Sequence, residues 1–366
     1  MPSLYIHIPF CTSKCLFCSF VIAVGQAHRV DEYLSALKQE AQKYRGTKIS
    51  TVYVGGGTPS FLTTDQIRKL EEIIKGCFDF QEGEFSFEAN PESVDCEKLK
   101  VLRNIGVNRI SLGIQSFNNR FLKFLGRGHD RQEAIKAFDQ LRESGFDNVS
   151  ADLMYSFPGQ TSEELENDVK GMIALKSDHV SLYSLTIEER SRFYVQGVQL
   201  DDPEKLAEDY MLILRLLEEG GLNQYEISNF ARPGKESQHN LNYWQGGEYI
   251  GLGVGAHSHQ NGRRYSNGAS FPVYLKLLKE GKDPLDTEEQ LTPAQRLVET
   301  VLFGLRTNAG VCLSDLEQRF HQSLESDKKN QIAQWVQDGF LIENDGVLLT
   351  TLKGRLVLDE LSARLI

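Results

Sequence analysis

Short runs of β-branched and aromatic residues alternate along the chain with longer stretches whose apolar residues recur at helical spacing. The short runs predict strands at residues 4–8, 51–56, 85–89, 108–116, 148–157 and 179–185. The longer stretches predict helices at residues 30–44, 63–77, 95–106, 131–145, 161–176 and 202–221. Thr161 and Glu164 have the spacing of a capping box at the start of one helix. This alternation of strands and helices predicts a parallel sheet with right-handed crossovers.

Polar and glycine-rich residues follow one predicted strand after another. These stretches are a cysteine cluster, "GGGTPS", "EANPES", "QSF" and "SFPGQT". A barrel gathers all the carboxyl ends of its strands around one mouth, whereas an open doubly wound sheet uses one switch point. The pattern therefore favours an α/β fold with a partial (β/α)6 barrel.

The pattern changes near residue 225, which divides the chain into three predicted parts. Residues 1–225 form the barrel core. Residues 226–290 are rich in glycine, asparagine and aromatic residues, and they predict an extended segment that closes over the barrel mouth. Residues 291–366 predict helices followed by a hairpin with an Asp345-Gly346 turn, a small winged-helix-like module.

Charge and composition narrow the classes of partner. The chain has 366 residues, a net charge of −11 and 40% hydrophobic residues, as in ordinary soluble proteins. The charge disfavours bulk attraction to nucleic acid, and the C-terminal module has 8 basic against 10 acidic residues. We expect that module to pack against the barrel. With no secretory signal and no long apolar run, a cytoplasmic protein is predicted.

Three cysteines, Cys11, Cys15 and Cys18, follow the first strand with the spacing C-x3-C-x2-C. The remaining cysteines are isolated: Cys77, Cys96 and Cys312. Clustered thiols in a reducing compartment indicate metal or redox chemistry. A [4Fe-4S] cluster held by three thiolates would leave one iron open to a substrate or cofactor. A zinc site with His7 or His28 as the fourth ligand is the alternative.

In this position, after the first strand of an α/β barrel, the cysteine motif resembles that of the radical S-adenosylmethionine (SAM) superfamily. The resemblance implies that SAM chelates the open iron and is cleaved to a 5′-deoxyadenosyl radical. It further implies that the backbone of "GGGTPS" runs beside the methionine of SAM, that Glu88 accepts both ribose hydroxyls and that Arg127 binds the carboxylate. The residues implied to contact SAM are Tyr5, Gly55, Gly56, Gly57, Thr58, Glu88, Gln115, Arg127 and Asp152.

Longer motifs narrow the resemblance. "YIHIPFCTSKCLFCSF", "FEANPES" and "DLMYSFPGQT" resemble oxygen-independent coproporphyrinogen III oxidase and its relatives over residues 3–258. The oxidase has a further cysteine where Phe20 stands and an extension before Tyr5. "HNLNYW" (239–244) instead fits the H-N-x-x-Y-W pattern of a sister group of heme chaperones. The resemblance implies heme binding and delivery to acceptors such as respiratory enzymes.

Heme needs an axial ligand and an apolar pocket with aromatic walls. By the resemblance, His239 is the candidate ligand, with Tyr243 and Trp244 as walls. His7 and His257 are rivals, more typical of rim or structural groups.

Two functions stay open at this point: heme trafficking, and an enzyme that decarboxylates the two propionates of coproporphyrinogen III. SAM cleavage, oligomeric state and transient docking at the inner face of the membrane also stay open.

Overall fold

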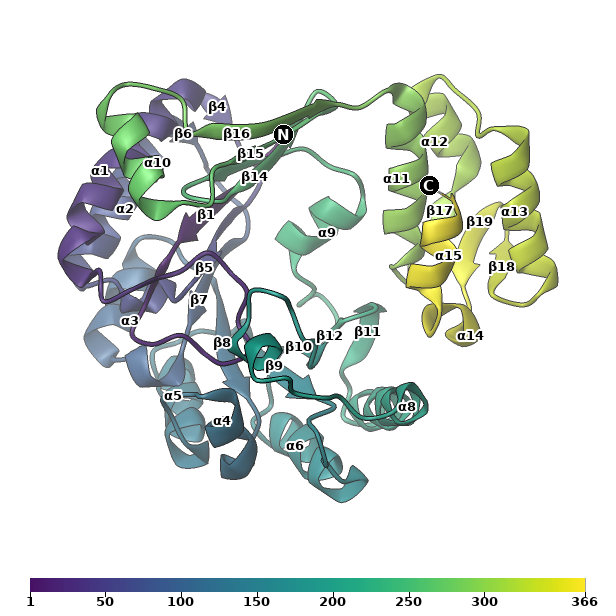
Figure 1. The fold of residues 1–366 in the computed structure, drawn as a ribbon, viewed down its shortest axis with the longest axis horizontal. Coiled ribbons are helices and arrows are strands. Elements are labelled where there is room, and N and C mark those ends of the chain that lie inside the picture. The colour runs from purple at the N-terminus through teal and green to yellow at the C-terminus, as the bar shows by residue number, and fades with distance from the viewer. Residues whose placement is uncertain (366) are drawn as a thin grey trace.

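The computed structural model describes residues 1–365 and contains a twelve-stranded sheet (Figure 1). Its central strands are parallel and pair in chain order. They are β1 (Ser3–Ile8), β5 (Val52–Gly56), β7 (Phe85–Ala89), β8 (Arg109–Gln115), β9 (Val149–Tyr155) and β10 (His179–Ser184). Each predicted strand is present. Because the order never reverses, the winding is that of a partial (β/α)6 barrel, which confirms the predicted fold.

The predicted helices are also present and cover the outer face of the barrel (Figure 1). They are α1 (Val30–Ala41), α2 (Thr64–Cys77), α3 (Cys96–Asn104), α5 (Arg131–Glu143), α6 (Ser162–Ala174) and α8 (Pro203–Glu219). The capping box of Thr161 and Glu164 forms as predicted. A further short helix, α4 (Asn119–Leu125), was not predicted. No helix within residues 1–365 has the length and apolar character that crossing a bilayer requires.

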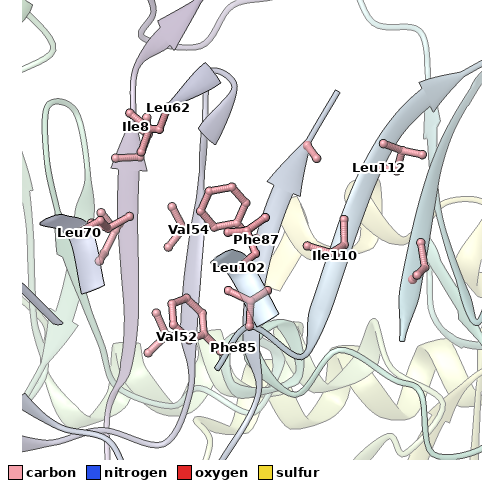
Figure 2. Close-up of a cluster of buried hydrophobic side chains, with 14 of the residues drawn as sticks. Ile8, Val52, Val54, Leu62, Leu70, Phe85, Phe87, Leu102, Ile110 and Leu112 are labelled. Atoms are coloured by element: carbon pink, nitrogen blue, oxygen red, sulfur yellow. The ribbon is translucent and has the colours of Figure 1, made fainter. Parts of the chain in front are cut away.

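The alternation of side chains along each strand decides which of them face the inside of the barrel. Val52, Val54 and Phe87 are buried among the apolar residues between sheet and helices, where Leu70 of α2 and Leu102 of α3 join them (Figure 2). Successive side chains of a strand point to opposite faces. The residues between these apolar positions, such as Tyr53 and Glu88, therefore face the inside of the barrel.

Residues 226–290 broaden the sheet on both edges. On one edge β12 (Asn229–Ala231) runs antiparallel to β10, and β11 (Asn223–Glu226) pairs antiparallel with β12. On the other, β13 (Tyr249–Leu252) runs parallel to β1 and leads to an antiparallel extension. That extension comprises β14 (His257–Gln260), β15 (Arg263–Asn267), helix α10 (Phe271–Lys279) and β16 (Leu285–Gln290).

Helix α9 (Gln238–Trp244) begins beside residues that precede the barrel strands, Thr51 before β5 and Glu84 before β7. The Glu84 carboxylate, just before β7, accepts bonds from the backbone N–H groups of Gln238 (2.9 Å) and His239 (3.1 Å) and from the Ser237 hydroxyl (3.2 Å). A buried anion thus satisfies the free N–H groups of the helix start. Residues 226–290 therefore contain the helix α9 as well as the strands that broaden the sheet, and their closing over the barrel mouth stays a prediction.

The C-terminal part forms a module with its own core around Trp335 (Figure 1). Its elements are α11 (Pro293–Leu305), β17 (Val311–Cys312), α12 (Leu313–Phe320), α13 (Ser326–Gln337), β18 (Leu341–Asn344), β19 (Val347–Thr350), α14 (Leu352–Arg355) and α15 (Leu358–Leu365). The hairpin turns at Asp345 and Gly346, whose φ angles are 50° and 78°. As expected, the module packs on the barrel: the Asn308 N–H donates to the Tyr225 carbonyl at 2.9 Å.

Candidate functional site

A cavity of about 760 Å³ opens at the carboxyl ends of the barrel strands, and we call it the mouth cavity. Most of the residues implied to bind the cluster and SAM line it: Cys11, Cys15, Cys18, Gly56, Gly57, Thr58, Glu88, Gln115, Arg127 and Asp152. Gly55 lies behind the cavity wall, against Glu88. Tyr5 does not line the mouth cavity but a second cavity, and its hydroxyl bonds to His7 Nδ1 at 3.0 Å.

The cysteine loop leaves β1 and is closed at its base by a short parallel pair, β2 (Phe10–Cys11) with β3 (Ala23–Val24). Its cysteines are free thiols. Burial raises the pKa of Cys11 to about 11 and also raises the pKa of Cys18. Within residues 1–365, no three His, Cys, Asp or Glu side chains are grouped to hold a single metal ion. Both ring nitrogens of His7 are already bonded, to Tyr5 and to the Val21 carbonyl, so zinc ligation by His7 finds no support here.

A hydrogen-bonded chain links two of the cysteines across the cavity. The Arg127 guanidinium lies 3.6 Å from Cys15 Sγ and donates to Asn90 Oδ1 at 2.7 Å. The Asn90 amide donates to Thr58 Oγ1 at 3.1 Å, and this hydroxyl lies 3.4 Å from Cys11 Sγ. Among residues 1–365, no hydrogen-bond partner reaches the buried Nε of Arg127. A fixed cation with a spare donor is suited to bind a ligand carboxylate beside the cysteines.

Gly57 allows the "GGGTPS" turn to run close beside the cysteine loop. A Cβ on Gly57 would lie 2.8 Å from the Pro9 carbonyl oxygen, 2.9 Å from that of Phe10 and 2.9 Å from Cys11 Sγ. These distances leave no space for a side chain. Gly57 therefore fixes the separation between this turn and the first cysteine.

Gln115 ends β8 in the left-handed region, with a φ of 71°. The register between β8 and β9 shifts between Leu112 and Gln115 at the same place. A non-glycine residue in this conformation is strained and is typical of functional sites. The irregular strand end places Gln115 in the wall of the mouth cavity.

Two carboxyl groups point from the strands into the mouth cavity. Glu88 accepts bonds from the Tyr53 hydroxyl at 2.8 Å and from the Gly56 N–H at 3.0 Å. Asp152 accepts a bond from the Ser111 hydroxyl at 2.9 Å. Burial is the main cause that raises the pKa of Glu88 to about 7 and that of Asp152 to about 6.

These raised pKa values predict a pH dependence of stability. Between about pH 4 and 7 the folded chain binds more protons at Glu88 and Asp152 than the unfolded chain does, so the free energy of unfolding should fall as pH rises. Urea unfolding of the cofactor-free protein across this range measures the slope. Glu88→Gln should flatten it, while Glu71→Gln, at an exposed ion pair on α2, should leave it unchanged. An equal slope in Glu88→Gln would contradict the assignment.

Comparisons with known proteins agree with this geometry. Residues 5–170 match the model of the radical SAM superfamily, and residues 291–357 match the HemN C-terminal domain. A Bacillus subtilis (strain 168) protein named heme chaperone HemW is 37% identical over 372 residues, which cover 98% of each chain. A Lactococcus lactis protein of the same name is 37% identical and covers 96% of this chain and 94% of its own. The chain belongs to the heme chaperone HemW family.

The HemW-family chain also matches a solved oxidase structure. Coproporphyrinogen III oxidase (HemN) from Escherichia coli superposes with a TM-score of 0.87 at 26% sequence identity, covering 99% of this chain and 89% of that one. The radical SAM superfamily implies a [4Fe-4S] cluster and SAM as cofactors. The residues around the mouth cavity fit these groups, because the free thiols, the unpartnered Arg127 Nε and the cradle at Gly57 lie together there.

The "HNLNYW" motif of this HemW-family chain lies on α9 and does not present its histidine to a ligand. His239 is only 1% exposed, with Nδ1 at 2.7 Å from Thr51 Oγ1 and Nε2 at 2.8 Å from the Tyr243 hydroxyl. Burial lowers the pKa of His239 to about 3, so the ring is neutral. Tyr243 and Trp244 instead line a second cavity, which contains none of the motif cysteines.

Sequence reasoning missed two residues that bond to side chains of the mouth cavity. Asn90 links Arg127 to Thr58, and Tyr53 holds one Glu88 oxygen. Asn90 follows Glu88 by two positions in the quoted motif, so its place after a strand was the available signal. No such signal marked Tyr53, because its contact with Glu88 depends on which face of β5 points into the barrel.

Proposed function

We propose that the chain is a heme chaperone that binds heme and delivers it to acceptor proteins such as respiratory enzymes. The observation that supports this most is the 37% identity to a protein named heme chaperone HemW over 98% of both chains. Similarity over whole chains includes the "HNLNYW" segment and the C-terminal module as well as the barrel. The two cavities give the chain separate places for a cofactor and a cargo.

The cofactor assignment within this proposal is residue by residue. Cys11, Cys15 and Cys18 would hold the cluster, and one iron would stay free for SAM. Arg127 would bind the SAM carboxylate, and Glu88 would accept its ribose hydroxyls. The remaining SAM contacts would come from Gly55, Gly56, Gly57, Thr58, Gln115 and Asp152, with Tyr5 supporting from behind. When bound, the pair supplies one-electron chemistry, and the protein orients it and excludes water.

The proposal predicts heme binding and directed transfer. The anaerobically reconstituted protein, titrated with hemin, should show a saturable Soret change. The hemin-loaded protein should then pass heme to a heme-free respiratory enzyme faster than an equal amount of free hemin does. Transfer no faster than from free hemin, or no saturable Soret change, would contradict the chaperone function.

The oxidase is a second candidate, because the structural match to HemN covers 99% of this chain. The same reconstituted protein should be incubated with coproporphyrinogen III, SAM and dithionite. We expect no protoporphyrinogen, with the HemN enzyme as the positive control. Product formation at a rate near that of HemN would favour the oxidase function instead.

We also propose a cytoplasmic location, with docking at the inner face of the membrane only while heme passes to a membrane-bound acceptor. The net charge of −11 supports this, because it opposes lasting adsorption to anionic lipid. Sedimentation with anionic vesicles should therefore leave most of the protein in the supernatant.

A further inference from the structure

A second cavity of about 660 Å³, which we call the edge cavity, lies between the β13–β15 edge of the sheet, α9 and the C-terminal module. Its volume falls in the range of small-molecule sites. Most of its walls are apolar, and its Phe, Tyr and Trp residues are Tyr5, Phe20, Tyr243, Trp244, Tyr249, Phe303 and Phe320. Flat aromatic walls from several elements suit a large planar ligand.

Phe20 connects the two cavities. It lines both of them together with Ser19, and its side chain is 65% exposed. Its exposed ring leaves apolar surface at the junction of the two cavities. A planar ligand in the edge cavity would cover Phe20 and lie beside the cysteine loop.

Strand β14 presents two imidazoles to the edge cavity. His257 and His259 are two positions apart, so they share one face of the strand. The His257 ring is exposed and makes no hydrogen bond within the described part of the chain. His259 differs, because its Nδ1 lies 3.5 Å from the Gly247 carbonyl and its Nε2 is buried, with no partner in the described part of the chain. Of the two, only His257 offers a nitrogen that an iron atom could approach without displacing protein.

His239 cannot offer its Nε2 in this conformation. The Thr51 hydroxyl donates to Ser3 and therefore accepts from His239 Nδ1–H. The Tyr243 hydroxyl then donates to the remaining lone pair on Nε2. His239 thus positions Tyr243 in the cavity wall, which gives the motif histidine a structural role.

The edge cavity also contains a cation that is free to bind a carboxylate. Arg296 stacks on the Phe320 ring at 5.2 Å and has no acidic partner within ion-pair distance among residues 1–365. Its neighbour Arg264 differs, because it is paired with Glu299. A guanidinium held by stacking, with its donors unused, is suited to bind a carboxylate.

We propose that the edge cavity is the porphyrin site, with His257 as the axial ligand of the heme iron and Arg296 as the partner of a propionate. This inference rests on the proposed chaperone function and assigns its cargo site. Imidazole ligation matches the heme iron, and the aromatic walls match the porphyrin ring. The unpaired guanidinium matches the acidic side chains of heme. The cargo would thus lie beside the mouth cavity, with Ser19 and Phe20 in the walls of both cavities.

Hemin titrations of single variants test the assignment. His257→Ala should weaken hemin binding by at least about tenfold and remove the histidine-ligated Soret spectrum. Added imidazole should restore that spectrum in His257→Ala. The control His28→Ala removes an exposed imidazole that lines neither cavity, and it should keep affinity and spectrum. Arg296→Gln should weaken binding about tenfold without changing the spectrum, and Arg263→Gln on β15 should have no effect.

The outcomes separate the two proposals. If the wild-type chain does not bind hemin, the chaperone function fails. If the wild type binds but His257→Ala keeps its affinity and spectrum, the site assignment fails while the function stands. Loss of the spectrum in His259→Ala alone, or in His239→Ala with an unchanged melting temperature, would also overturn His257 as the ligand.

Discussion

A Cys15→Ala variant, reconstituted anaerobically with iron and sulfide, should retain less than about a tenth of the roughly four iron atoms per chain expected for the wild type. Cys15 lies between Cys11 and Cys18 in a loop whose thiols all line the mouth cavity. With one of three thiolates removed, two ligands cannot hold a cubane against loss of iron. Iron and sulfide analysis and the absorbance near 400 nm measure the result.

The control for this prediction is Cys96→Ala. Cys96 is an exposed free thiol at the start of α3 and does not line the mouth cavity, so its replacement should leave the cluster content unchanged. In the wild type, the electron paramagnetic resonance of the reduced cluster should change on adding SAM. A full cluster in Cys15→Ala would mean that Cys15 is not a required ligand, and a spectrum indifferent to SAM would mean that the fourth iron is not open to SAM.

The barrel could be predicted because its signals are local. Each strand is a short apolar run that ends in glycine or polar residues, and each helix has an apolar stripe. Since parallel strands place their carboxyl ends together, the residues after them were expected to meet, and the mouth cavity contains ten of those expected around the cluster and SAM. Side chains on the inward face, such as Tyr53, could not be placed without knowing how the strands pair.

The helix at the "HNLNYW" segment was not predicted, because its structure depends on distant residues. Its asparagines and aromatics are poor helix formers, yet α9 forms because the Glu84 carboxylate binds its first N–H groups. Glu84 is more than 150 positions earlier in the sequence, so no local pattern joins them. The same distance explains His239: its partner Thr51 is 188 positions away, and only the fold shows that its ring is occupied.

Gly57→Ala should destabilise the protein and disrupt the cysteine loop together. The new Cβ would contact the carbonyl oxygens of Pro9 and Phe10 at under 3.0 Å, and these backbone atoms cannot rotate away. Overpacking of this kind costs about 1–3 kcal/mol of unfolding free energy. Because the Cβ would also meet Cys11 Sγ at 2.9 Å, cluster content should fall to less than about half of the wild type.

Two glycines provide matched controls for Gly57→Ala. Gly128 also lines the mouth cavity, but a Cβ there would meet only the Glu92 side chain at 3.5 Å or more, an ordinary contact. Gly128→Ala should therefore keep both stability and iron content. Gly76, inside α2, has no atom near its Cβ position, so Gly76→Ala should stabilise the fold by about 0.5–1 kcal/mol. The three substitutions are chemically the same and differ only in the room around the new Cβ. Equal effects at all three would therefore show that the close approach at Gly57 does not position Cys11.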